Sequence, residues 1–262
     1  MEVIWTRNKT TGSIILLTLL VMGLVVKWIF FPSVDDKFFQ LDYGRLQTAP
    51  SGLFVFRATH FGDSRRSGCF TAWNRGGGGS GPGLPRFLGR NVTLEQIIPA
   101  AYQVQPSRVV FPENMPTNRF DLLVTVRKEP AEKLKAIVKR KFGYTAQWKE
   151  VETEVLEIRI VRHNAPGLRP SGDASSGTQF RSGKRYLTHA PVGQLVWILE
   201  SFLKVPVVDK TGLTGFYDYS FPWDWRGIEN PDLATVNGWL AELGLTLRPE
   251  PEIMTMMVVK KE

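Results

Sequence analysis

Residues 207–219 read VVDKTGLTGFYDY, the strongest local signal in the chain. Two glycines in this stretch permit a positive φ, and an Asp and a Thr can hydrogen-bond to amides of their own turn. The pattern therefore predicts a tight connection between strands at 205–209 and 215–223. The residues that we assign to this connection are Asp209, Lys210, Thr211, Gly212, Leu213, Gly215, Tyr217 and Asp218.

A functional interpretation of the same stretch makes Asp209 and Asp218 a carboxylate pair for acid–base catalysis or cation binding. In a strand, however, Asp218 and Tyr217 point to opposite faces, and nothing in the sequence fixes how far Asp209 lies from Asp218. We therefore interpret the stretch as a structural turn.

Periodic apolar segments on both sides of this turn predict an α+β fold. Leu233, Val236, Leu240 and Leu243 fall on one face of a helix at 232–243, and a matching set marks a helix in the first half. The predicted first-half elements are a strand at 53–59, a helix at 93–104, strands at 108–111 and 119–126, a helix at 130–142, and strands at 144–150 and 154–162. Those of the second half are a helix at 191–203, strands at 205–209 and 215–223, a helix at 232–243, and strands at 245–250 and 253–260.

The two halves share this order of elements. Phe120-Asp121 corresponds to Tyr217-Asp218, 97 residues later, and Gly143 corresponds to Gly244, 101 residues later. This near-constant spacing predicts an internal duplication into two similar α-β-β-α-β-β modules, with helices packed on small, mainly antiparallel sheets. The alternative is a chance match between two stretches of the same class.

Glycine, serine and proline mark the connections between these parts. RGGGGSGPGLP at 75–85 cannot hold a regular element and predicts a mobile insertion; it lacks the Lys and Ser or Thr of a phosphate-binding loop. The predicted organisation is a cytoplasmic N-terminus and transmembrane anchor at 1–31, a tether at 32–50, a first module at 51–163, a linker at 164–182 and a second module at 183–262.

The N-terminal segment IILLTLLVMGLVVKWIFF, residues 14–31, contains one charge. A bilayer core of about 30 Å needs about 20 apolar residues, so this run is just long enough to span it. Arg7 and Lys9 precede the run and favour a cytoplasmic N-terminus, with the bulk of the chain in the periplasm. No A-x-A cleavage site follows, so we expect a single-pass anchor in a bacterial inner membrane rather than a cleaved signal peptide. The anchor residues that we assign are Ile14, Leu20, Val26, Trp28 and Phe31.

The 207–219 stretch also resembles the V-V-D-x-T-G-L-x-G-x-Y-D-F signature of a soil-bacterial, Acidobacteria-type family of unknown function. We call residues 207–219 the signature turn. Upstream, Asn91-Val92-Thr93-Leu94 and Arg119-Phe120-Asp121-Leu122 are similar to further motifs of that family, and the resemblance covers 50–262. Pro99, inside the first predicted helix, departs from the family pattern, and the glycine-rich loop looks like an insertion.

This resemblance implies a secreted or membrane-anchored protein. Domains of the family also occur fused to membrane metallopeptidase-type or thioredoxin-like partners, which points to envelope sensing or assembly. Each half is also weakly similar to the short modules at the periplasmic ends of secretins and TonB-dependent receptors, which bind other proteins.

Other residue types give little sign of catalysis. His60, His163 and His189 lack the spacing of a helical metal pair, and the single cysteine, Cys69, excludes an internal disulfide and has no base placed near it by the sequence. No G-x-S-x-G motif occurs. We expect no metal, no cofactor and no enzymatic activity.

The net charge of +8 suits an anionic partner. Outside the cytoplasm we expect no nucleic acid partner, and the lipid bilayer and other membrane or periplasmic proteins are the better candidates. A basic helix at 130–142 carries Lys133, Lys135, Lys139, Arg140 and Lys141, which we interpret as a solvated face. The residues that we assign as partner contacts are Trp223, Trp225, Arg226, Arg65 and Arg66.

Together these features predict a membrane-anchored protein-interaction or assembly module, such as an accessory subunit of a membrane complex. An envelope sensor that binds a small ligand or peptide is the alternative, and an enzyme comes third. A subunit should co-purify with partners in fixed stoichiometry, whereas a sensor should be monomeric and gain thermal stability with its ligand.

Overall fold

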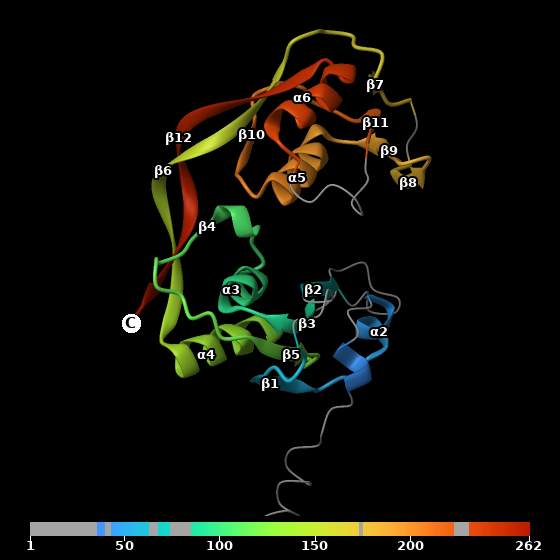
Figure 1. Ribbon diagram of the computed structural model, residues 1–262. Helices are drawn as coiled ribbons and strands as arrows, with labels where there is room; N and C mark the ends of the chain where they lie inside the picture. Colours follow the sequence, from blue (N-terminus) through green and yellow to red (C-terminus); the bar gives the residue numbers. More distant parts are fainter. Residues whose placement is uncertain (1–35, 40–42, 63–67, 74–84, 173–174, 223–230) are drawn as a thin grey trace, which may run out of the picture.

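The computed structural model describes residues 36–39, 43–62, 68–73, 85–172, 175–222 and 231–262. Its central element consists of two long strands, β6 (Tyr144–Ile160) and β12 (Leu245–Lys261), each of 17 residues. They pair antiparallel along their whole length, from Leu245 opposite Ile160 to Lys261 opposite Tyr144. Figure 1 shows this ribbon joining two bodies that lie at its opposite ends.

The lower body in Figure 1, which we call module 1, contains a four-stranded sheet in the order β1-β5-β3-β2. Helices α3 and α4 contribute to its core on one face of this sheet. Its elements are β1 (Phe54–Ala58), β2 (Gly68–Trp73), β3 (Pro85–Val92), α3 (Leu94–Tyr102), the 3-10 helix η2 (Pro106–Arg108), β4 (Val109–Val110), β5 (Phe120–Val124) and α4 (Pro130–Phe142).

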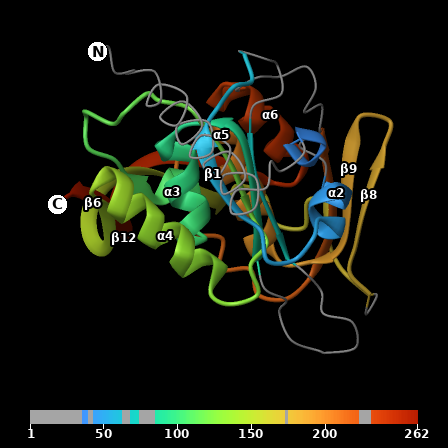
Figure 2. The same ribbon diagram turned by 90° about the horizontal axis from the view of Figure 1, so that it is seen from below.

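The upper body, module 2, contains a sheet in the order β7-β11-β9-β8, with α5 and α6 contributing to its core. The hairpin of β8 and β9 projects from this module in the second view (Figure 2). The elements are β7 (Leu168–Pro170), β8 (Gly177–Arg181), β9 (Lys184–Ala190), α5 (Val192–Leu203), β10 (Val207–Asp209), β11 (Tyr217–Pro222) and α6 (Leu233–Glu242).

The third sheet, in the order β10-β6-β12-β4, belongs to both modules. Strand β4 of the first half pairs parallel with β12, and β10 of the second half pairs parallel with β6. Strands β6 and β12 also contribute residues to the hydrophobic cores of both modules. Strand β6 gives Tyr144 to the core of module 1 and Ile158 to that of module 2, whereas β12 gives Leu247 to module 2 and Val259 to module 1.

A second connection between the modules runs beside this ribbon. Glu200 on α5 is 3% exposed and accepts two hydrogen bonds from the guanidinium of Arg108, at 2.7 Å from Nε and 2.9 Å from Nη2. The Ser107 hydroxyl donates a third, at 2.7 Å. A buried carboxylate needs such partners, so this cluster holds α5 against η2.

The segment preceding β1 packs onto module 1. The 3-10 helix η1 (Asp36–Phe39) and helix α2 (Tyr43–Thr48) bury Phe39 and Leu46 against Leu88 and Leu123 of the sheet. The Arg86 guanidinium donates hydrogen bonds to the carbonyl oxygens of Leu46, Gln47 and Ala49. These acceptors lie at the C-terminal end of α2, where they lack partners within the helix. The stretch expected to be a tether is thus largely part of module 1 over its described residues.

The predicted α+β class is confirmed, and four predicted helices are found, but the strand assignments need correction. The strand pairs predicted at 144–150 and 154–162, and at 245–250 and 253–260, are the single strands β6 and β12. Strands β2, β3, β8 and β9 were not predicted, and β7 and β8 lie in the predicted linker. From β1 to β6 and from β7 to β12, each half consequently has the order β-β-β-α-β-β-α-β rather than α-β-β-α-β-β.

The predicted anchor and glycine-rich loop fall mainly outside the described residues. Among the helices that the structure describes, none combines the length and apolar character needed to cross a membrane. The anchor residues Ile14, Leu20, Val26, Trp28 and Phe31 precede the first described residue, Asp36, and of the loop at 75–85 only Pro85 is described.

Both halves place an aspartate at the same irregularity of their main sheet. Asp121 on β5 accepts a hydrogen bond from the Asn91 amide, and Asp218 on β11 accepts one from the His189 amide. Asn91 and His189 both have a positive φ, of 52° and 46°. Each carboxylate therefore satisfies an amide at a point where the strand pairing shifts its register.

Replacement of Asp121 by alanine is expected to destabilise the protein more than replacement of Asp218. Asp121 is 0% exposed and accepts from the Asn91 amide, the Thr59 hydroxyl and Arg57. Its loss leaves the Asn91 amide and the Thr59 hydroxyl without this acceptor, while Arg57 keeps its contact with Asp36, at a cost of about 3 kcal/mol. Asp218 is half-buried, so Asp218→Ala should cost less. Chemical denaturation of the full chain in mild detergent measures both; equal losses would contradict this ranking.

Candidate functional site

The signature turn is held by hydrogen bonds within itself. The Asp209 carboxylate accepts from the Thr211 amide at 2.8 Å and from the Thr211 hydroxyl at 2.7 Å, and the Thr211 hydroxyl oxygen accepts from the Leu213 amide at 3.1 Å. Gly212 and Gly215 have φ values of 66° and 106°, the left-handed region that favours glycine. These contacts support the structural interpretation of the turn.

Lys210 connects the turn to the central ribbon. Its ammonium contacts Glu252 of β12 and lies 3.9 Å from a carboxylate oxygen of Glu157 on β6. The hydrogen bond to Glu252 is the main cause that raises the pKa of Lys210. The turn is thereby fixed to the strands that both modules share.

The two aspartates of the turn accept hydrogen bonds from different partners. Asp209 serves its own turn, whereas Asp218 accepts from the His189 amide across the sheet, at 2.8 Å. This hydrogen bond is the main cause that lowers the pKa of Asp218, because it favours the ionised carboxylate. Both groups therefore have a structural use.

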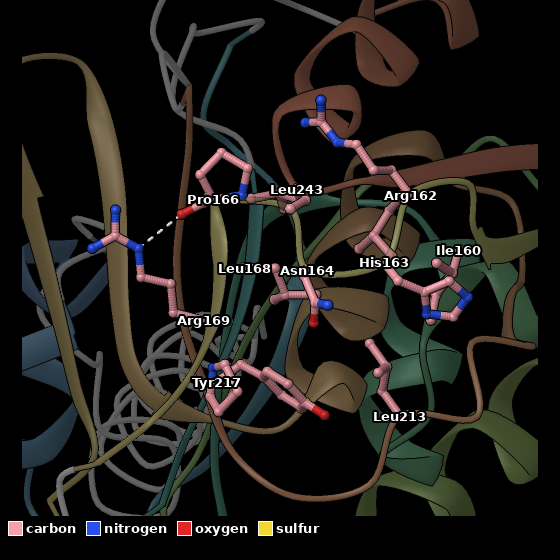
Figure 3. Close-up of a pocket in the computed structure, with 13 residues that line it drawn as sticks. Ile160, Arg162, His163, Asn164, Pro166, Leu168, Arg169, Leu213, Tyr217 and Leu243 are labelled. Atoms are coloured by element: carbon pink, nitrogen blue, oxygen red, sulfur yellow. Dashed lines mark hydrogen bonds between the residues drawn. The ribbon is translucent and has the colours of Figure 1, made fainter.

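A cavity of about 320 Å³ lies beside the signature turn in module 2. Figure 3 shows Leu213 and Tyr217 of the turn on one side of it, and the residues that follow β6 on the other. Its lining residues are Ile160, Arg162, His163, Asn164, Ala165, Pro166, Leu168, Arg169, Pro170, Leu213, Tyr217, Leu243 and Leu245. The cavity therefore combines the signature turn with the end of the long strand.

Close backbone packing shapes the wall formed by residues 161–167. The Gly244 carbonyl accepts hydrogen bonds from the Val161 and Arg162 amides, at 2.9 Å and 3.1 Å. A Cβ atom at Gly244 would lie 2.3 Å from the Arg162 carbonyl oxygen, and one at Gly167 would lie 2.5 Å from that of Glu242. Only glycine lets this wall lie directly on the end of α6.

The cavity has a largely apolar surface with basic residues at its edge, where the guanidinium groups of Arg162 and Arg169 point outward (Figure 3). Leucines and prolines form much of its lining, while Arg162, His163 and Arg169 are its basic members, and none of the described lining residues is acidic. Arg169 is oriented by a hydrogen bond from its Nε to the Pro166 carbonyl oxygen, at 2.8 Å (Figure 3). Such a site favours an apolar group that carries or adjoins a negative charge.

The structure brings only two of the predicted turn residues, Leu213 and Tyr217, into this cavity. The opposite wall was not predicted, because the sequence pattern of residues 162–170 indicates the end of a strand and a linker. The sequence signal for this wall was a cluster of Arg, His and Asn residues beside prolines. The predicted partner contacts Trp223, Trp225, Arg226, Arg65 and Arg66 lie outside the described residues.

The three histidines occupy separate places. His163 lines the cavity, His60 contacts Asp36 with its Nε2 at 2.8 Å, and the His189 ring stacks on Phe216 with the ring centroids 4.0 Å apart. Within the described residues, no group of three or more His, Cys, Asp or Glu side chains could hold a metal ion.

Cys69 on β2 packs against the core of module 1, and burial raises the pKa of its thiol to about 12. We therefore expect the folded protein to resist alkylation at pH 8, with a rate at least about a hundredfold below that of the denatured chain, because the thiolate is the reacting species. Iodoacetamide labelling followed by mass spectrometry measures this ratio. Equal rates in the folded and denatured protein would show an ordinary, exposed thiol.

Comparison with known proteins gives a family but no activity. No curated protein and no solved structure matches the chain. The family described as "Protein of unknown function (DUF3738)" matches residues 95–261, a span that includes α3 to β12 and the signature turn. Because this match covers well over half of the 262 residues, the chain belongs to the DUF3738 family of unknown function.

Proposed function

We propose that this protein is a membrane-anchored interaction module, which receives part of a partner protein in the cavity beside the signature turn. The partner supplies an apolar side chain that adjoins one or more carboxylates. The observation that carries this proposal is the lining of the cavity, in which an apolar surface is accompanied by three basic residues and by no acidic one among those described.

Exposed apolar residues next to the cavity wall support a protein partner. Val161, which precedes Arg162, is 57% exposed, and Phe216, which precedes Tyr217, is 49% exposed. Large apolar side chains of this kind commonly contribute to protein interfaces, where a buried anchor is surrounded by further contacts. The cavity would bind the apolar side chain of the partner, and Val161 and Phe216 would extend the interface around it.

The proposed location follows from the sequence. The apolar run at 14–31, with basic residues before it, favours a single-pass anchor in the inner membrane of a bacterium and a periplasmic position for both modules. An accessory subunit of a membrane complex would meet its partner there. The proposal includes neither a cofactor nor nucleic acid.

A second candidate is the binding of a small anionic molecule or short peptide by the same cavity. Its volume of about 320 Å³ lies at the lower end of the range of small-molecule sites. In that case the protein would be a sensor, and its thermal stability would rise with the ligand.

The substitution Leu213→Trp tests the proposal, because the larger side chain occupies the cavity. The full-length protein should co-purify in mild detergent with a defined partner in fixed stoichiometry. Leu213→Trp should weaken this association by roughly tenfold or more, as expected for the loss of a central anchor. Quantitative mass spectrometry of the purified complex measures the ratio.

Val110→Trp provides the matched control, since Val110 is an exposed residue of β4 in module 1. Both variants should unfold near the temperature of the parent protein. Equal retention of the partner by the two variants would contradict a contact through the cavity. A protein that migrates alone, but is stabilised by a small anion in a way that Leu213→Trp abolishes, would favour the second candidate.

A further inference from the structure

A second groove lies on module 1, at the end of the molecule remote from module 2. It has a volume of about 320 Å³ and is lined by Phe54 of β1 and by Lys133, Ala136, Ile137 and Arg140 of α4. These helical residues follow the spacing i, i+3, i+4, i+7 and so form one stripe along α4. Phe54 is 36% exposed, so the groove offers an apolar surface between an edge strand and a helix.

Positive charge surrounds this apolar surface. Lys133 and Arg140 lie two helical turns apart on the same stripe, and none of the described lining residues is acidic. Next to the groove, the Lys141 ammonium lies 5.5 Å from the centroid of the Phe56 ring. Long basic side chains beside an apolar surface suit the boundary between lipid head groups and acyl chains.

The chain itself restricts where this groove can be. Asp36, the first described residue, accepts a hydrogen bond from Arg57 of β1 at 2.8 Å. Only four residues separate Asp36 from Phe31, the last residue of the predicted anchor, so the Cα atoms of Phe31 and Asp36 can lie at most about 18 Å apart. Strand β1, which carries Arg57, also carries Phe54 of the groove, and β1 is an edge strand of its sheet.

We infer that the groove of Phe54, Lys133, Ala136, Ile137 and Arg140 binds anionic phospholipid head groups at the surface of the anchoring membrane. Module 1 then rests on the bilayer through β1 and α4, and module 2, with its cavity, is held away from it. This inference rests on the membrane anchor of the proposed function. It does not depend on the cavity or its partner.

The reactivity of a cysteine placed in the groove tests the inference. The full-length chain carrying Cys69→Ala and Ala136→Cys is reconstituted into phosphatidylcholine vesicles, with or without phosphatidylglycerol, and its labelling by an impermeant maleimide is timed. Anionic vesicles should slow the labelling about fivefold or more, because each basic residue at a lipid surface contributes about a fivefold preference. High salt should remove the difference.

The charge-reversal pair Lys133→Glu and Arg140→Glu should abolish the effect of phosphatidylglycerol. The control pair Arg181→Glu and Arg248→Glu, at exposed positions of β8 and β12, should retain it. Resistance to alkaline carbonate extraction reports the anchor separately. A chain that is retained in the vesicles but labelled equally in both lipids would overturn lipid binding and leave the anchor intact. A chain that carbonate extracts would overturn the anchor and the inference together.

Discussion

The antiparallel pairing of β6 with β12 is the constraint on which the rest of the structure depends. Each strand begins in one module and ends in the other, so each core contains residues from both. The residues near the middle of the ribbon are mostly exposed, and the ribbon there is held by its backbone ladder rather than by a core. Neither module is complete without the chain of the other half, and we infer that the two fold together.

This crossed arrangement also explains how the candidate site is built. The cavity forms where the chain leaves β6 and lies on the end of α6, while the signature turn approaches from β10. Lys210 fixes the turn to Glu252 of β12, so the cavity walls are tied to the central ribbon. The Arg108 and Glu200 cluster adds a second connection between the modules, at η2 and α5. A ligand at the cavity would therefore contact elements that both halves position.

The sequence predicted the helices better than the strands, for identifiable physical reasons. Helical periodicity, as in Leu134, Ile137 and Val138, indicates a single buried face of the helix. This pattern does not depend on how the sheets are arranged. The long strands were divided because their exposed central segments, rich in glutamate and containing Pro249 and Pro251, resemble turns. Strand β4 pairs with β12, and β10 pairs with β6. Both pairings join residues that are distant in sequence, so no local pattern predicts them.

The site was predicted in part for the same reason. Leu213 and Tyr217 belong to a turn whose glycines and hydrogen-bonding residues are local signals, whereas His163, Asn164 and Arg169 become a wall only once α6 and β11 are in place. The pairing of Asp218 with the His189 amide likewise joins residues 29 apart in the chain. Local chemistry thus identified the turn, and tertiary structure was needed to show what faces it.

The proposed contact between a partner protein and the cavity beside the signature turn can be tested by crosslinking. A photo-reactive amino acid at position 163, introduced into the full-length chain in its native membrane, tests this most directly, with position 149 on an exposed part of β6 as the control. We expect a discrete protein adduct from position 163 that is missing from position 149. No adduct at position 163, or the same adducts from both positions, would contradict it.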